Sequence, residues 1–414
     1  MNKKLNCVMD IAEEMLISGA EVHRVEESVV RMCTALGATR VDVFIITSSI
    51  VCTVFEGDLS HSQTRRITSS TTNVEKIHAL NSLSRKICNI CELNDSVYEE
   101  INRIKAIKTY PFWIEVLAYA VIAWAFTLFF GGTLIESVVS LFVGATVRFG
   151  IYFTDKFINN KIFSKFLSSV IASLLALLAV RLKFIEGVDK VIIGNIMTLI
   201  PGIGLTNAFR DLFTGDSIAG ILRTVEAVLT AIAIAAGYFI AVIIDRSGSH
   251  LVIREVDPNK IVQVVTGFIG SIGFAFLFNI KGKRFVFAAI GGLISWSLFL
   301  LLNTFIKSEP ACYFIVALVI AFYAEIMARV IKTPTTTFIM TSLIPLIPGS
   351  SLYYTMAYLI DYLMNYKNFG QGEIFLDKAI VTLSLSIALA LGIIIATAII
   401  KIIMKITKKN KSTK

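Results

Sequence analysis

The chain has 414 residues, of which 55% are hydrophobic and only 17% are charged, and its formal net charge is +9. A soluble protein of this length would carry about a quarter charged residues. The composition therefore excludes an ordinary soluble protein and predicts an α-helical polytopic membrane protein.

Residues 1–110 differ from the rest, because their charge content predicts a small α+β domain that precedes the membrane part. Alternating and helical patterns place its helices at 5–17, 21–36, 73–93 and 95–107, and its strands at 41–46, 50–55 and 65–69. Acidic residues at positions 10, 13 and 14 interrupt the first helix, so no signal peptide is expected. We therefore expect this domain to remain in the cytoplasm.

Ten segments after residue 110 are long and apolar enough to span a bilayer, which requires about 20 such residues. They lie at 113–130, 134–153, 166–183, 189–209, 217–244, 260–280, 285–303, 311–330, 337–363 and 378–403. The sequence therefore predicts ten transmembrane helices.

The tetrapeptide Leu-Ile-Pro-Gly occurs in the fourth segment, at 199–202, and again in the ninth, at 346–349. Proline interrupts a helix, and lipid cannot satisfy the freed backbone groups, so such a break must be buried or line a wet cavity. Paired breaks at matching positions of two halves are typical of a transporter's binding site. Two tolerated proline kinks without a ligand are the simpler alternative.

The two motifs are 147 residues apart, and this offset also superimposes four of the second five segments on the first four. The membrane part is therefore predicted to consist of two five-helix repeats, residues 111–246 and 258–405. Because five is odd, the repeats must be inverted relative to each other. The distribution of lysine and arginine places both termini in the cytoplasm, with residues 406–414 as a basic cytoplasmic tail.

Polar residues near the motifs are the candidates for substrate contact, because charge inside a bilayer is costly and usually faces a cavity or a partner. Arg223 and Glu226 lie three residues apart on one helical face and can pair. A structural ion pair and a role toward substrate or proton are both open. The predicted substrate-binding residues are Thr198, Pro201, Gly202, Gly204, Asn207, Arg210, Asp211, Arg223, Glu226, Pro348, Gly349 and Ser350.

Glu226 and Glu325 are the predicted proton-coupling carboxylates. Glu325 lies well inside the eighth segment, about 20 Å from its start at the rise of an α-helix. A lone buried carboxylate binds a proton readily, because burial disfavours its charged form. Arg329 is one turn further on, so the sequence leaves open whether Glu325 is free or salt-bridged.

Three groups of residues resemble the threonine/serine exporter family. The segments 19–21, 24–26 and 41–44 resemble its N-terminal signature, and 197–208 with Arg210-Asp211, Gly215-Asp216 and Glu226 resembles its central motif. The second half, with 323–325, 328–329, Pro334 and 343–350, resembles the small partner domain of the same family, here fused to the first. The resemblance implies a cytoplasmic N-terminal domain, ten spans and proton-driven export of threonine or serine through the cell membrane.

Two alternatives to amino-acid export remain open. A two-chain relative is associated with succinate export, and a dicarboxylate would require two cationic sites where a zwitterion requires one cation and one anion. A membrane-tethered enzyme or sensor would instead use the cluster His23, Arg24, Glu26 and Glu27 for acid–base chemistry.

The partners expected from the sequence are a small-molecule substrate, protons and membrane lipid. No nucleic-acid, metal or cofactor site is predicted, no enzyme activity is expected, and association into a homo-oligomer is left open. The chain carries no Walker motif, which argues against transport driven by ATP on this chain.

Overall fold

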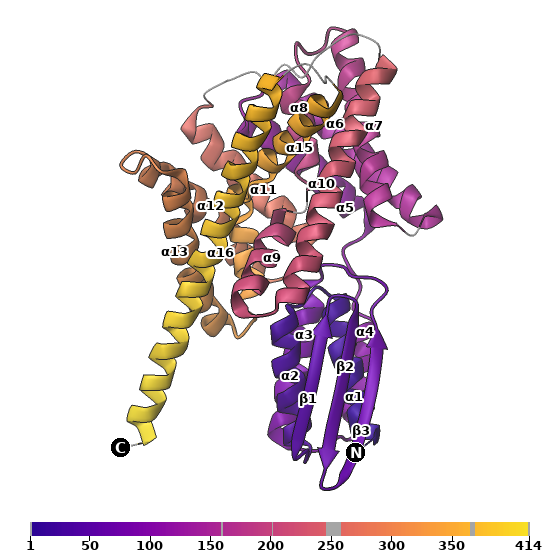
Figure 1. Cartoon of the computed structure of the whole chain (residues 1–414), viewed down its shortest axis with the longest axis vertical. Coiled ribbons are helices and arrows are strands. Elements are labelled where there is room, and N and C mark those ends of the chain that lie inside the picture. The colour runs from indigo at the N-terminus through magenta and orange to yellow at the C-terminus, as the bar shows by residue number, and fades with distance from the viewer. Residues whose placement is uncertain (1, 159, 201, 246–257, 365–368, 413–414) are drawn as a thin grey trace.

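The computed structural model describes residues 2–158, 160–200, 202–245, 258–364 and 369–412 (Figure 1). An N-terminal unit, residues 2–105, lies at one end of a bundle of mostly apolar helices, residues 112–412. The two parts have separate hydrophobic cores, apart from Ala219 of the bundle, which packs into the core of the N-terminal unit, and Val74 of the N-terminal unit, which packs into the core of the bundle.

The N-terminal unit consists of four helices on a three-stranded antiparallel sheet of order β1-β2-β3. Its elements are α1 (Asn2–Ile17), α2 (Val22–Ala35), β1 (Arg40–Ile46), β2 (Ser49–Glu56), β3 (Leu59–Arg66), α3 (Val74–Ile90) and α4 (Asp95–Lys105). In β2, alternate residues Ile50, Cys52 and Val54 are fully buried under the helices, as the period of a half-buried strand requires.

The third strand lies at 59–66, so its predicted position at 65–69 was wrong. The turn that follows β2 has Gly57 at φ 60°, and it pairs Glu56 directly with Leu59. A hairpin turn this tight requires positive φ, and it starts β3 at once. The strand was missed because most of its residues are polar and it lacks the apolar alternation of a half-buried strand.

Eight helices in the described part of the chain are long and apolar enough to cross a membrane, and the chain is a polytopic α-helical membrane protein. They are α5 (Phe112–Phe129), α6 (Leu134–Phe157), α7 (Lys161–Arg181), α10 (Ser217–Asp245), α11 (Lys260–Leu277), α12 (Lys283–Asn303), α13 (Glu309–Ile331) and α16 (Phe369–Ser412). Eight of the ten predicted segments thus correspond to continuous helices.

The fourth and ninth predicted segments are broken at the repeated motif. The first is divided into α8 (Asp189–Ile196) and α9 (Gly202–Thr214). The second is divided into α14 (Thr336–Ser342), a short 3-10 helix η1 (Ile344–Leu346) and α15 (Gly349–Met364). Both second pieces begin at the glycine of the motif, although Pro201 itself lies outside the described residues.

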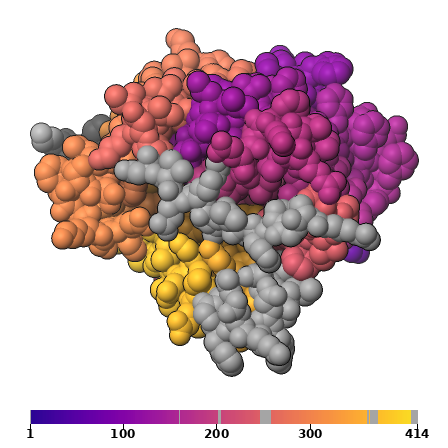
Figure 2. Space-filling view, turned by 90° about the horizontal axis from the view of Figure 1, so that it is seen from above, coloured from indigo at the N-terminus to yellow at the C-terminus, as the bar shows by residue number. Residues whose placement is uncertain are grey.

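Contacts within the two halves follow matching patterns. α5 packs on α6 as α11 packs on α12, and α7 packs on α10 as α13 packs on α16. The broken helices cross over: α9 contacts both α10 and α16, and α15 contacts both α16 and α10. Figure 2 shows the face opposite the N-terminal unit, where the magenta surface of the first half lies beside the orange and yellow surface of the second.

Candidate functional site

The two motifs lie against each other inside the bundle. A Cβ atom at Gly349 would lie 3.3 Å from Cγ2 of Ile200 and 3.3 Å from Sδ of Met197. Pro348 and Gly349 are buried, and Ile200 is half-buried. Two segments separated by about a third of the chain are therefore in contact, and the absence of a side chain at Gly349 permits this close approach.

A small cavity of about 20 Å³ lies next to this contact. Thr206 and Asn207 of α9 provide its polar wall, and the second half provides an apolar wall of Ile339, Met340, Leu343, Ile347, Leu389 and Ile393. This volume holds about one water molecule. The structure is therefore closed at this position, because an amino acid or dicarboxylate needs considerably more space.

The remaining uncharged candidates lie on the same elements. Thr198 donates from Oγ1 to the carbonyl of Asn195 at 3.0 Å, the local backbone bond that hydroxyl side chains commonly form in helices. Gly204 is in the first turn of α9, and Ser350 is half-buried in the first turn of α15. Gly202 is the first residue of α9.

Arg223 pairs with Asp211, and the suggested pairing with Glu226 is therefore corrected. Nη1 of Arg223 lies 3.0 Å from Oδ2 of Asp211, whose side chain is only 5% exposed. The reason is the helix hairpin: α9 and α10 reverse direction at Gly215, where φ is 100°, so the end of α9 faces the second turn of α10. Glu226 is exposed.

Arg210 is paired with the N-terminal unit. Its Nη1 donates to Oε1 of Glu21 at 3.0 Å, and both side chains are mostly buried. Burial raises the pKa of Glu21, but the charges of Arg210 and Arg24 outweigh this effect and hold the pKa below its usual value. The carboxylate is therefore ionised at neutral pH and forms a true ion pair.

Several atoms of this charged cluster have unused hydrogen-bonding capacity. Nη2 of Arg210 and Oδ2 of Asp211 and Asp216 are buried and have no hydrogen-bond partner among the described residues. Oδ2 of Asp211 lies within ion-pair distance of Arg223 but outside hydrogen-bond geometry. Buried polar atoms without partners are costly, so they favour a ligand or water at this position.

Glu325 is salt-bridged, which settles the question that the sequence left open. Oε1 accepts from Nε of Arg329 at 3.1 Å, and Oε2 accepts from Oγ1 of Thr335 at 2.8 Å. Its position is also shallower than its distance from the start of the span suggested. It lies six residues before the end of α13, about 9 Å along the helix, near the loop where Thr333 contacts His78 of the N-terminal unit.

The structure also contains a buried charged pair that the sequence analysis did not single out. Asp189 and Lys190 begin α8, each is only 6% exposed, and Nζ of Lys190 lies 3.3 Å from Oδ2 of Asp189. Their position directly before the apolar run of α8 was the available signal. This pair lies at the opposite end of the broken helix from Arg210.

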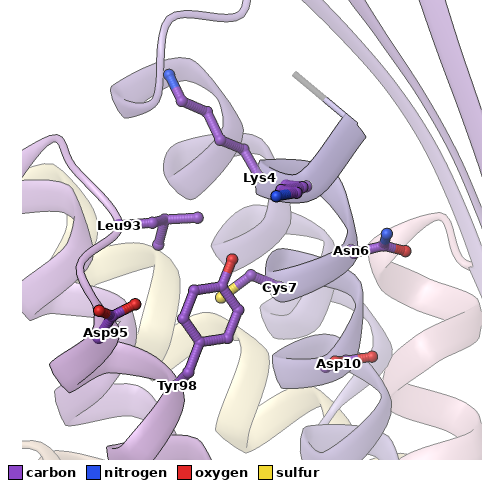
Figure 3. A pocket seen from close by; sticks show the side chains of 8 residues that line it. Lys4, Asn6, Cys7, Asp10, Leu93, Asp95 and Tyr98 are labelled. Carbon is purple, nitrogen blue, oxygen red and sulfur yellow. The ribbon is translucent and has the colours of Figure 1, made fainter.

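The N-terminal unit has a wide pocket of its own, of about 600 Å³, between α1 and α4 (Figure 3). Figure 3 shows Cys7 and Tyr98 at its centre, with Asp10 and Asp95 to the sides and Lys4 above. Nζ of Lys4 is held by the carbonyl of Leu36 at 2.9 Å. This pocket is separate from the membrane motifs.

Three of the four residues considered for acid–base chemistry make structural contacts, while His23 is exposed. Oε1 of Glu26 accepts the backbone N–H of Ile45 at 3.1 Å, and burial together with the charge of Asp216 raises the pKa of Glu26. Glu27 pairs with Arg31 on its own helix. Arg24 contributes instead to the cluster around Glu21.

Comparison with known proteins identifies the family. A model described as a threonine/serine exporter matches residues 6–244, and a second, described as "Threonine/Serine exporter, ThrE", matches residues 263–399. The chain belongs to the threonine/serine exporter family. The first match covers the N-terminal unit and the first half of this exporter, and the second covers most of the second half, so the two matches follow the division seen in the helix contacts.

A curated relative of this exporter is the threonine/serine exporter of Corynebacterium glutamicum. It is 22% identical over 366 residues, which cover 84% of this chain and 74% of the relative. No solved structure matches the chain. The family is one of exporters and not of enzymes, and it implies a small-molecule substrate.

Proposed function

We propose that this exporter moves threonine or serine out of the cell by proton-coupled secondary transport across the cell membrane. The observation that carries the proposal is the meeting of two broken helices, α8–α9 and α14–α15, beside a small cavity with one polar wall. Broken helices that meet between two halves are the usual way in which secondary transporters build a substrate site. The family and the curated relative support threonine and serine as the substrates.

The arrangement of the helices supports ten crossings in two inverted repeats. When each broken helix counts as one crossing, residues 112–245 and 258–412 each contain five. Turns near residues 161, 278 and 333 all contact the N-terminal unit, as expected if the chain returns to the same side after every second crossing. The matched helix contacts further support two copies of one fold.

Substrate recognition is assigned to the polar face of α9 and to the start of α15. The freed N–H groups at the beginnings of α9 and α15 suit a carboxylate. Arg210 offers a buried donor without a hydrogen-bond partner among the described residues, and Thr206 and Asn207 line the cavity. Oδ2 of Asp211 is ion-paired with Arg223 but accepts no hydrogen bond from it, so it can accept one from an ammonium group. A zwitterion uses one cation and one anion, so this pairing favours an amino acid over a dicarboxylate.

The proposal is tested with purified protein in liposomes that are loaded with threonine, serine and succinate together. We expect threonine and serine to leave faster when the outside is acidic, because proton entry drives export. Liposomes that carry Arg210→Gln protein provide the matched control for leak. Selective efflux of succinate would replace the amino-acid assignment with the dicarboxylate alternative.

Proton coupling is assigned to Glu325 and Glu226. We expect Glu325→Gln to slow efflux driven by a pH gradient and to leave exchange of labelled for unlabelled threonine partly intact. The reason is that exchange needs the substrate site but no net proton movement. Equal loss of both modes would instead make Glu325 a structural residue that holds Arg329 and Thr335.

A further inference from the structure

The N-terminal unit is attached firmly to the second half of the membrane bundle. The N–H of Val74 donates to the carbonyl of Phe278 at 3.0 Å, and Nδ2 of Asn279 donates to Oδ1 of Asn73 at 2.9 Å. Nη2 of Arg284 contacts both carboxylate oxygens of Glu75, at 2.9 and 2.8 Å. These contacts surround one short turn between α11 and α12, and the hydrogen bond between His78 and Thr333 adds a second attachment nearby.

The attachment to the first half is much narrower. Among the described residues it includes the ion pair between Glu21 and Arg210, the packing of Ala219 into the core of the N-terminal unit, a small contact of α10 with β1, and an exposed contact of Lys161 with Ser70. Arg210 and Ala219 lie on either side of the α9–α10 turn. Glu21 is therefore the main polar connection between the N-terminal unit and the broken helix α9.

An N-terminal unit that contacts both halves restrains their relative motion. Secondary transporters with inverted repeats expose their site alternately by moving one repeat or bundle against the other. The unit must release one half in such a movement. The half with the single ion pair and the small packed surface is the one that it releases, because the other half is held by several hydrogen bonds and a two-oxygen ion pair.

We propose that Glu21 is a latch for the transport site: its carboxylate occupies Arg210 in the closed state, and an incoming substrate carboxylate displaces it. Nη1 of Arg210 donates a hydrogen bond to Glu21, while Nη2 is buried without a hydrogen-bond partner among the described residues. One of the two terminal nitrogens of the guanidinium is therefore available to a ligand. Guanidinium groups bind carboxylates well through two parallel hydrogen bonds, and a substrate that used both nitrogens would displace the single bond to Glu21. The proposal rests on the proposed function, because it makes Arg210 a residue that binds the exported carboxylate.

The test measures whether the interface opens, independently of transport. Ala219→Cys places a thiol at a position that is only 2% exposed, beneath the N-terminal unit. The rate of maleimide labelling at position 219 in the full-length protein, resolved by peptide mass spectrometry, then reports opening of the interface. The native exposed thiol of Cys91 serves as an internal control in every sample.

We expect Glu21→Gln to increase the labelling rate at position 219 about tenfold, which corresponds to about 1.4 kcal/mol of lost preference for the closed interface. Threonine should accelerate labelling in the protein with native Glu21 and have little further effect in the Glu21→Gln variant. Glu27→Gln is the matched control, because Glu27 lies on α2, the helix that begins directly after Glu21, is exposed and pairs locally with Arg31. Equal labelling of the Glu21→Gln and Glu27→Gln variants would overturn the latch.

Exchanging the two charges distinguishes loss of the ion pair from misfolding of the single variants. The double change Glu21→Arg with Arg210→Glu restores an ion pair with the two charges exchanged, so slow labelling should return. Threonine efflux should stay lost, because position 210 no longer carries the guanidinium that binds the substrate carboxylate. Fast labelling of the double variant, or normal efflux by it, would overturn the latch. If Glu21→Gln accelerates labelling but threonine neither accelerates it nor is exported, the latch stands and the threonine assignment fails.

Discussion

Asp211 and Arg223 illustrate how a buried charge in this exporter depends on its partner. Asp211 is almost completely buried, and Arg223 from the next helix provides the nearest opposite charge. Desolvation of both groups is costly, so the pair adds little stability as a whole but a great deal is lost when only one member remains. Glu226, one turn away from Arg223, is exposed, so its charge has no comparable desolvation cost.

The first prediction separates these two carboxylates. Asp211→Asn should reduce the amount of folded protein, because loss of one partner of a buried pair costs about 3–5 kcal/mol. Glu226→Gln should leave this amount unchanged, and Asp211→Leu with Arg223→Met should recover much of the loss. Quantitative size-exclusion chromatography of detergent extracts measures the folded fraction. A stable Asp211→Asn protein would show that Arg223 has another partner.

His78 gives the attachment of the N-terminal unit a dependence on pH. Burial lowers its pKa, Arg284 and Arg85 lower it further, and Glu75 acts in the opposite direction. The folded protein therefore favours the neutral ring more than the unfolded chain does, whose histidine titrates near about 6.5. The stability contributed by this site is present above that pH and is lost as the pH falls toward the lowered pKa.

Acidification should therefore lower the melting temperature of the native protein more than that of the His78→Gln variant. Glutamine retains a hydrogen-bonding group for Thr333 but does not titrate. Thermal unfolding of both proteins at pH 7.5 and at about pH 5.5, followed by intrinsic fluorescence, measures the difference. His61 lies in the solvent-facing strand β3, so His61→Gln provides the control and should behave like the native protein. If acidification lowers the melting temperatures of the His78→Gln and His61→Gln variants equally, the acid sensitivity belongs to groups other than His78.

At the level of elements, the broken helices are arranged by one close contact. Gly349 starts α15 and approaches Ile200 and Met197 so closely that a methyl group would crowd both side chains. Both neighbours are flexible side-chain atoms, so a small group can be accommodated by a shift of a few tenths of an ångström. A larger group would separate the two halves at the site.

Substitutions at Gly349 should therefore act in order of size. Gly349→Ala should slow threonine efflux modestly, and Gly349→Val should reduce it at least about tenfold while the protein remains folded, since overpacking typically costs about 1–3 kcal/mol. Gly150→Ala is the control, because its methyl group would meet only Cδ1 of Ile171, at 3.2 Å, away from both motifs. Efflux from liposomes, normalised to folded protein, provides the measurement. Full activity of the valine variant would place the substrate path elsewhere.

At the scale of the whole molecule, the N-terminal unit and the C-terminal end of α16 lie toward the same end of the bundle (Figure 1). The last helix continues beyond its apolar stretch into a lysine-rich end. Lysine and arginine next to membrane spans favour the cytoplasmic side. The arrangement therefore supports a cytoplasmic location for both termini.

Thiol labelling of intact cells tests this topology. An impermeant maleimide should reach cysteines introduced at Glu186 and Lys307, which are exposed in the turns on the opposite side of the bundle. It should not reach a cysteine at Lys156, or native Cys91, until the cells are permeabilised. Labelling of Cys91 in intact cells would reverse the orientation, and labelling of Glu186→Cys without Lys307→Cys would contradict the inverted repeats.

The sequence alone determined the elements whose signal is local. Apolar runs of bilayer length predicted the membrane helices, proline and glycine predicted where two of them break, and the periodicity of residues 1–110 predicted the helices and two of the strands. These features depend on neighbours within a few turns, so their physical cause lies within the segment itself. The resemblance of the motifs to the exporter family likewise needed no structure.

Tertiary structure alone decided which charged groups meet. Glu21 and Arg210 are 189 residues apart, and no local pattern could select one among the many acids and bases of the chain. The choice of Asp211 over Glu226 by Arg223 depends on the reversal at Gly215, which sets the facing surfaces of α9 and α10. The pairing of Glu325 and the burial of Asp189 and Lys190 were decided in the same way, because burial depends on what packs around a helix and not on its own sequence.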